Sequence, residues 1–357
     1  MDRRHSIALD GGTIAACYAR RNRKKGMMNR RQLVSALAPC LAVLGLVGFA
    51  GSAQGQRATD YPNRPVRIVV PYAAGGGTDF IARGTAEKLS QQMGQQFVIE
   101  YRGGAAGAIG TEAVAKSTPD GYTLLLTPQA PIQLIPHLRK LNYDPLKDLI
   151  PVGRMSEQIA GFAVHPSLGV KNMTEFVALA KKNPGKFTFG TAGVGSVNHL
   201  RVETLKLMAG IDLLHVPYKG VGEALPDVLS GTIQLMVDSI VLQPAKSGHL
   251  TLLSVLTPER YSEFPDVATM REQGFPDYDV PVWFGTYAPA GVPEPILEKL
   301  HREIARMHAD AEFQAKQFAG GQFVYREALS MPQLRERIAK DSERFADLIR
   351  RANIKLD

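Results

Sequence analysis

Two glycine-rich segments of this 357-residue sequence carry the groups best suited to bind an anion. They are Gly75-Gly76-Gly77-Thr78-Asp79 and Thr191-Ala192-Gly193-Val194-Gly195-Ser196-Val197-Asn198-His199. A glycine-rich turn between a strand and a helix lets backbone N–H groups approach an anion, and the helix dipole favours negative charge there. Thr78, Ser196 and Asn198 add side-chain donors. Either segment alone fits an ordinary tight turn equally well, but two of similar design favour an anion site.

Neither segment matches a known phosphate-binding motif. Phe80 stands where the third glycine of Gly-x-Gly-x-x-Gly belongs in the first segment, and Asn198 stands there in the second. Gly185-Lys186 has no glycine five residues before it, so the sequence also lacks a P-loop. These departures argue against a nucleotide as the ligand.

Ser196, His199 and Asp238 raise a second possibility, a hydrolase with a catalytic triad. The spacing argues against it, because a nucleophile elbow reads Gly-x-Ser-x-Gly whereas Ser196 lies in Gly-x-Gly-Ser-x-x-His. His199 fits better as the hydrogen-bond partner of a neighbouring loop than as a general base. The remaining histidines show no metal-ligand spacing, so neither a metal nor another cofactor is expected.

The hydrophobic pattern predicts strands and helices in alternation, in two blocks. Such alternation is typical of an α/β protein with mainly parallel sheets, and two blocks indicate two lobes. Trp283 and Phe284 fit either a cleft wall or the core. The predicted strands are 66–70, 97–100, 122–126, 161–164, 187–190, 214–216, 233–237 and 280–287. The predicted helices are 80–93, 111–116, 174–182, 197–209, 222–229, 294–307 and 331–350.

Most of the net charge of +8 belongs to the amino-terminal end. Nine of the 42 basic and two of the 34 acidic residues lie within 1–55, which leaves 33 basic and 32 acidic residues elsewhere. A remainder of +1 argues against nucleic acid or a membrane surface as a partner. Both cysteines also lie within 1–55, so disulfide scaffolds and thiol chemistry are excluded from the rest.

Residues 1–55 are typical of a leader with a secretory signal peptide. Arg30-Arg31 precedes an apolar run over 33–50, and small residues follow at 51–55, with cleavage expected after Ala53 or Gly55. Translation starting at Met27 or Met28 would give a signal of ordinary length. A membrane anchor and a twin-arginine signal are weaker alternatives. The mature chain is therefore expected in the periplasm.

Several further segments together resemble the substrate-binding proteins of tripartite tricarboxylate transporters, also called Bug receptors. The resemblance covers essentially the whole mature chain. The matching segments are Tyr61-Pro62-x-Arg64-Pro65-Val66-Arg67-Ile68-Val69-Val70-Pro71-Tyr72, Gly75 to Asp79, Pro119-Asp120-Gly121-Tyr122-Thr123-Leu124-Leu125, Gly195-Ser196-x-x-His199-Leu200, His215-Val216-Pro217-Tyr218-Lys219-Gly220 and Pro289-Ala290-Gly291-Val292-Pro293.

The resemblance implies a type II periplasmic-binding-protein fold, α/β in class, with two lobes that close on a ligand cleft between them. We expect 56–158 plus 281–357 to form lobe 1 and 159–280 to form lobe 2. The implied function is capture of a small organic carboxylate and its delivery to the permease subunits of a membrane transporter, without catalysis, by a monomer. A periplasmic hydrolase and a ligand-sensing subunit of a signalling system remain the alternatives.

The resemblance also implies the binding residues, with two halves of a carboxylate clamp on the glycine-rich loops and an adjoining cleft segment at 218–220. The expected ligand-binding residues are Tyr72, Gly76, Gly77, Thr78, Asp79, Thr127, Gly195, Ser196, His199, Tyr218, Lys219 and Asp238. The chain departs from the family pattern at 101–107 and 127–129, in the part of the cleft that selects the far end of the ligand. The particular acid therefore does not follow from the resemblance.

Overall fold

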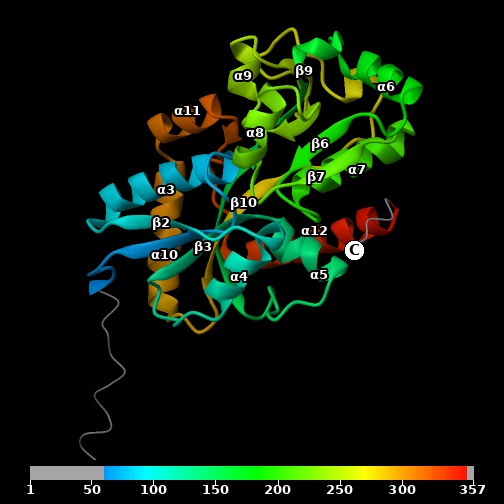
Figure 1. Cartoon of the computed structure of the whole chain (residues 1–357). Coiled ribbons are helices and arrows are strands. Elements are labelled where there is room, and N and C mark those ends of the chain that lie inside the picture. Colours follow the sequence, from blue (N-terminus) through cyan, green and yellow to red (C-terminus); the bar gives the residue numbers. More distant parts are fainter. Residues whose placement is uncertain (1–59, 352–357) are drawn as a thin grey trace, which may run out of the picture. The chain divides into compact units, whose positions relative to one another are not determined.

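The computed structural model describes residues 60–351, and within them the strands form two sheets (Figure 1). The first sheet has six strands in the order β11-β4-β10-β3-β1-β2. Its strands are β1 (Val66–Val70), β2 (Phe97–Tyr101), β3 (Thr123–Pro128), β4 (Leu149–Gln158), β10 (Trp283–Pro289) and β11 (Gln322–Phe323). The second has five strands in the order β7-β6-β8-β5-β9. Its strands are β5 (Gly161–Val164), β6 (Thr188–Thr191), β7 (Leu214–Pro217), β8 (Leu235–Asp238) and β9 (Thr251–Val255).

Helices cover both faces of each sheet, and the alternation of buried side chains along the strands shows which helices cover which face. In β1, Ile68 belongs to the cluster formed with α3 and α10, whereas Val69 packs with α4 and α12. In β5, Phe162 packs with α6 and α7, and Ala163 with α8 and α9. The helices are α3 (Gly77–Met93), α4 (Ala108–Ala115), α5 (Ile135–Leu138), α6 (Met173–Lys182), α7 (Val197–Ala209), α8 (Val221–Leu229), α9 (Leu242–Lys246), α10 (Glu294–His308), α11 (Ala311–Ala319) and α12 (Met331–Arg351).

The chain passes from one sheet to the other at two adjacent places. The first crossing is direct, because β4 ends at Gln158 and β5 begins at Gly161. The second returns after β9 and enters β10 at Trp283. The two crossings are hydrogen-bonded to each other, since Gln158 N donates to Val282 O at 2.7 Å. The two lobes are therefore joined by two segments that lie side by side, and the described residues 60–351 belong to one compact unit that contains both sheets.

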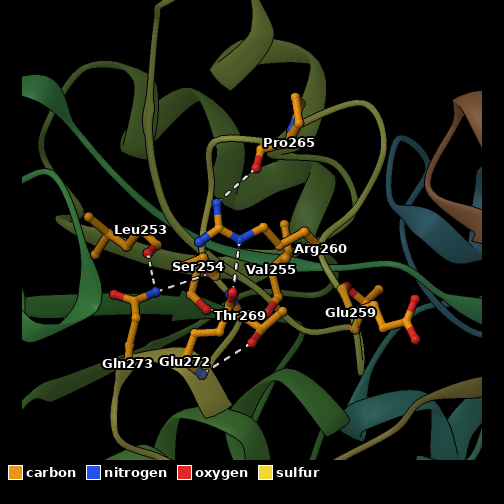
Figure 2. A network of polar contacts seen from close by, with 11 residues as sticks. Leu253, Ser254, Val255, Glu259, Arg260, Pro265, Thr269, Glu272 and Gln273 are labelled. Carbon is orange, nitrogen blue, oxygen red and sulfur yellow. Dashed lines mark hydrogen bonds and ion pairs between the residues drawn. The ribbon is translucent and has the colours of Figure 1, made fainter.

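The connection from β9 to the second crossing has its own polar network (Figure 2). Arg260 Nε donates to Glu272 Oε1 at 2.9 Å, and the Glu272 carboxylate accepts from Thr269 N at 2.8 Å. Gln273 Nε2 donates to Leu253 O in β9 at 2.9 Å. These contacts hold the connection against β9 at the edge of the second sheet.

The structure confirms most of the predicted elements. The strands 66–70 and 161–164 and the helix 197–209 agree with the prediction to the residue. The sequence reasoning missed β4, β9, α5, α9, α11 and β11. The strand β4 contains Pro151, which a strand interior rarely accepts, and the structure places this proline beside a register shift between Thr286 and Tyr287 of β10.

The expectation of mainly parallel sheets is wrong. In the first sheet β1 is parallel to β2 and β3, but β10 runs antiparallel to β3 and β4, and β11 antiparallel to β4. In the second sheet β5 runs antiparallel to β8 and β9. The cause is the double crossing: a strand that leaves a lobe and a strand that returns beside it must run in opposite directions.

The leader assigned to 1–55 lies outside the described residues, and the lobe boundaries remain a prediction. Within 60–351, we find no helix that combines the length and the apolar character needed to span a membrane.

A buried carboxylate joins the last helix to the second crossing, and its removal should destabilise the protein. Asp341 Oδ2 accepts from Trp283 Nε1 at 2.8 Å and from Arg337 Nε at 2.9 Å. We expect Asp341→Ala to lower the free energy of unfolding by about 1–3 kcal/mol, because the indole N–H is left buried without an acceptor. Trp283 is the only tryptophan of the chain, so its fluorescence in denaturant titrations reports the transition.

Asp347→Ala is the matched control, because this aspartate lies on the same helix but is exposed and pairs only with Arg350 and Arg351 on the surface. Its removal should change stability by less than about 0.5 kcal/mol. Equal losses in the two variants would contradict a specific role for Asp341.

Candidate functional site

A small cavity lies between the two sheets, where both glycine-rich loops meet the crossing strands. Its volume is about 20 Å³, which is room for little more than one water molecule. Its wall mixes backbone and hydroxyl donors with amide, carboxylate and apolar groups. The lining residues are Tyr72, Ala73, Gly76, Gly77, Thr78, Pro128, Gln158, Ala192, Ser196, Val197, Asn198, Val221, Asp238, Val282 and Phe284.

The loop before α3 is held in shape by Asp79. Its Oδ2 accepts from Gly75 N at 2.8 Å, in a turn where Gly75 has φ +95°. Its Oδ1 accepts from Arg83 Nε at 2.8 Å and from Tyr101 OH at 2.6 Å. Asp79 does not line the cavity, and its carboxylate is occupied by these three donors. It shapes the loop that presents Gly76, Gly77 and Thr78 to the cavity.

The helix α3 presents an N-terminus that no side chain caps. Gly76 is the N-cap residue and makes no side-chain hydrogen bond, so helix geometry leaves the first-turn N–H groups without intrahelical acceptors. Close approach of neighbouring side chains favours glycine here. A Cβ on Gly76 would lie 2.6 Å from Val221 Cγ2 of the second lobe, and one on Gly77 would lie 2.7 Å from Gln158 Nε2. The first turn of α3 therefore presents backbone N–H donors and the positive end of the helix dipole to the cavity.

The loop before α7 uses its glycine N–H groups internally. Gly193, with φ +104°, donates to Thr191 Oγ1 at 3.1 Å, and Gly195 donates to His199 Nδ1 at 3.2 Å. The sequence reasoning expected such glycine amides to face an anion, and in this loop they are occupied. Ser196 caps the helix, with its hydroxyl accepting from His199 N at 3.3 Å. The parts of this loop that reach the cavity are therefore Ala192, Ser196 and the first turn of α7.

His199 and His215 form a stacked pair under this loop. Their ring centroids are 4.2 Å apart, and Phe189 stacks on His215 at 4.9 Å. Burial, the neighbouring His215 and then Lys206 lower the pKa of His199 to about 3. Burial and then Lys206 lower the pKa of His215 to about 4. Both rings are therefore neutral at ordinary pH, which lets His199 Nδ1 accept from the loop.

The geometry does not support the hydrolase alternative. His199 Nδ1 faces Gly195 N, and its Nε2 lies 3.7 Å from Glu203 Oε1, so both ring nitrogens point at groups other than the Ser196 hydroxyl. A group with a pKa of about 3 is also a weak general base at neutral pH. Ser196 and His199 interact through the helix cap, in which His199 N donates to the Ser196 hydroxyl.

A buried amide and carboxylate network forms the floor of the cavity. Asp238 Oδ2 accepts from Gln158 Nε2 at 2.9 Å and from Asn198 Nδ2 at 3.0 Å. Asp238 Oδ1 accepts from Ile240 N at 3.1 Å. Asn198 also donates to Val237 O at 2.5 Å. The network joins the first crossing strand to α7 and β8, and it directs the Gln158 and Asn198 amides at the cavity wall.

The structure brings half of the twelve expected binding residues to the cavity. The residues that line it are Tyr72, Gly76, Gly77, Thr78, Ser196 and Asp238. The residues that stand behind or beside it are Asp79, Thr127, Gly195, His199, Tyr218 and Lys219. Tyr218 OH donates to Asp227 Oδ2 at 2.5 Å, and Lys219 is exposed. Thr127 is buried next to Pro128, which does line the cavity.

The sequence reasoning missed Gln158, Val221 and Val282 as cavity residues. Gln158 ends a strand that was not predicted, and Val282 lies on the returning crossing. No local pattern in the sequence marks either residue, because both reach the cavity only through the pairing of the two crossings. Of the two aromatic residues left open, Phe284 lines the cavity, whereas Trp283 is buried and bonded to Asp341.

The histidine pair predicts that stability rises with pH below neutrality. Both folded pKa values lie below the ordinary value of about 6.5, so the unfolded chain binds more protons between about 4 and 6.5. Each such histidine adds a slope of at most about 1.4 kcal/mol per pH unit to the free energy of unfolding. His215→Phe keeps the stacked ring and removes one titrating group. Urea titrations from pH 7 to 4 should therefore give a flatter profile for this variant than for the wild type.

His249→Phe serves as the control, because His249 is exposed and lies outside the stacked pair. Its profile should follow that of the wild type. A His215→Phe profile as steep as the wild type would show that the pair does not carry the pH dependence.

Comparisons with known proteins agree with this arrangement. Residues 81–354 match the family described as "Tripartite tricarboxylate transporter family receptor". The chain is 35% identical over 323 residues to protein BugT of Bordetella pertussis, covering 88% of this chain and 98% of BugT.

Two solved structures share the fold over nearly their whole length. The periplasmic binding protein BugD superposes with a TM-score of 0.80 at 33% identity, covering 83% of this chain and 99% of BugD. The R. palustris protein Rpa4515, solved with adipate, gives a TM-score of 0.79 at 30% identity, covering 83% of this chain and 99% of Rpa4515. This chain therefore belongs to the receptor family of the tripartite tricarboxylate transporters, a family of periplasmic solute-binding proteins with two α/β lobes.

Proposed function

We propose that this receptor captures a small organic carboxylate between its lobes and delivers it to the membrane subunits of a tripartite tricarboxylate-type transporter. One observation carries the proposal: the first turns of α3 and α7, one from each lobe, end at the same cavity. Two helix N-termini with the Thr78 and Ser196 hydroxyls suit a single carboxylate group. The similar R. palustris protein was solved with adipate, which is such an acid.

The proposed clamp works with neutral donors. A cation in the cleft would be left buried and unpaired whenever the closed cleft lacked an anion, which is energetically unfavourable. Neither Arg102 nor Lys219 supplies a cation to the cavity. Arg102 pairs with Glu100 on the surface, and Lys219 is exposed outside the cavity lining. Recognition therefore rests on oriented N–H and O–H groups.

Ligand entry requires the lobes to separate. A cavity of about 20 Å³ is too small for an organic acid. Loops of the two lobes also approach each other closely beside it. Ala73 N lies 3.4 Å from Lys219 O, and a Cβ on Gly222 would lie 2.1 Å from Ala74 O. We infer a hinge motion about the paired crossings, of the kind known for periplasmic binding proteins.

The finer parts of the proposal concern processing and partners. Family membership implies a periplasmic location. We propose that a signal peptide within 1–55 is cleaved during export, that the mature protein is a monomer without catalytic activity, and that permease subunits receive its ligand. The low basicity of His199, whose pKa is about 3, supports binding rather than turnover.

A thermal-shift screen against a panel of acids tests the proposal. The panel should pair adipate with its diamide, and include malate, citrate, benzoate and glutamate, so that the carboxylate is the variable. An acid at 100 times its dissociation constant adds about 2.7 kcal/mol to the free energy of unfolding. A shift with acids and none with adipamide supports a carboxylate receptor. No shift with any acid, or equal shifts with adipate and adipamide, would count against it.

Removing one hydroxyl from each half of the clamp should weaken binding. We expect Thr78→Val and Ser196→Ala each to reduce the affinity for the best acid of the panel by roughly 1–3 kcal/mol, through the loss of one donor to a charged group. Isothermal titration calorimetry measures the change. Unchanged affinity in both variants would refute the clamp.

Ser196 also caps α7, so Ser196→Ala needs a control for lost capping. Asn172 caps α6 in the same way, accepting from Glu175 N at 2.9 Å, and does not line the cavity. Asn172→Ala should lower stability by about 0.5–2 kcal/mol, as any lost cap does, and leave affinity unchanged. A loss of affinity in this variant would show that capping, and not the Ser196 hydroxyl, explains the effect.

A further inference from the structure

Arg201 is a fully buried cation that does not line the cavity. It lies on α7 one turn after Asn198 and is 0% exposed. Its Nη1 donates to Gln158 Oε1 at 2.6 Å, and its Nε donates to Val280 O at 3.2 Å. Gln158 belongs to the first crossing and Val280 to the second. One side chain of the second lobe therefore contacts both segments that join the lobes.

The contact also orients the Gln158 amide. Because Gln158 Oε1 accepts from Arg201, its Nε2 is turned to Asp238 Oδ2, 2.9 Å away. The same Nε2 lies where a Cβ on Gly77 would come within 2.7 Å. The amide thus stands between the first turn of α3 and the Asp238 carboxylate, with its direction set by the arginine behind it.

A further contact fixes the helix backbone to the returning segment. Tyr278 OH donates to Arg201 O at 2.9 Å, and the Tyr278 ring packs edge-on against Phe162 of β5 at 5.9 Å. Asn198 and Arg201 are three residues apart, so they lie on the same face of α7. The turn that presents Ser196 and Asn198 is therefore anchored directly to the hinge through Arg201.

We propose that Arg201 is a positioning residue for ligand capture: it sets the angle of α7 relative to the crossing strands, so that hinge closure brings Ser196 and Asn198 to the bound anion. An arginine buried this way carries a desolvation penalty, and apolar residues of similar size are often at least as stabilising. The planar guanidinium of Arg201 can donate to two acceptors at once, and here these acceptors lie on the two crossings. The proposal rests on the receptor function proposed above.

The first test needs no ligand. Hydrogen exchange of the full chain is compared between wild type and Arg201→Met, which preserves length and apolar volume. We expect at least about fivefold faster exchange in segments 157–160 and 278–283, where Gln158 N is bonded to Val282 O, because local opening is no longer held back. Exchange in β1, remote from Arg201, should stay unchanged. Faster exchange throughout the protein, or no increase in exchange at the two crossings, would overturn the proposal.

The second test follows binding through Trp283, the single tryptophan, which begins β10 next to the cavity residues Val282 and Phe284. Stopped-flow fluorescence with adipate should give an association rate near that of the wild type. The dissociation rate of Arg201→Met should be roughly ten- to a hundredfold faster, because the closed form loses hydrogen bonds made by a charged group. Equal dissociation rates would overturn the proposal.

Arg154→Met is the matched control. Arg154 is a partly buried arginine on the same strand as Gln158, but its guanidinium lies over the Tyr325 ring, 3.4 Å from the centroid, away from α7. It should leave exchange at 278–283 and adipate dissociation unchanged. If wild type itself fails to bind adipate, the proposed ligand class is at fault, while the exchange comparison still decides the role of Arg201.

Discussion

The hydrogen bond from Gln158 N to Val282 O, where the two crossings run side by side, is the constraint on which the rest of the molecule depends. It places the end of β4 against the segment leading into β10, and so fixes where the two sheets face each other. Gln158 and Val282, which both line the cavity, belong to these two crossings. The cavity is therefore lined by both lobes and by the two segments that join them.

The two glycine-rich loops share a design but use it differently. Before α3 the helix is uncapped, and Asp79 shapes the loop from behind while the first turn faces the cavity. Before α7 a serine caps the helix, and the glycine amides are taken by Thr191 and His199. The first lobe therefore offers mainly backbone donors, and the second offers the Ser196 hydroxyl and the Asn198 amide on a loop held by neutral histidines.

Electrostatics in the site are arranged so that no formal charge is left without partners. Asp238 accepts from two amides and a backbone N–H, and Arg201 donates to an amide oxygen and a carbonyl. The Gln158 amide links the two, with its oxygen on the arginine and its nitrogen on the aspartate. A buried cation and anion are thus separated by one neutral group, which orients the side chains around the cavity.

The sequence by itself determined much of this protein, because local signals are strong where they are repeated. The alternation of strand and helix predicted α/β lobes, and Gly75 to Asp79 and Gly193 to His199 marked the loops that reach the cavity. The matched family segments extended this to a receptor with two lobes. Periodicity and turn chemistry are properties of a few neighbouring residues, so they can be recognised without the fold.

Only the tertiary structure decided which residues form the floor of the cavity and how the strands run. Gln158, Val282 and Arg201 have no local signature, since their roles come from contacts between segments 40 or more residues apart. The alternation of strands and helices predicted parallel strands, but the double crossing places β10 antiparallel to β3 and β4. In the folded chain Asp79 and His199 accept hydrogen bonds from the backbone of their own loops. The sequence shows only which donors and acceptors are present, because hydrogen-bond partners are determined by the three-dimensional arrangement.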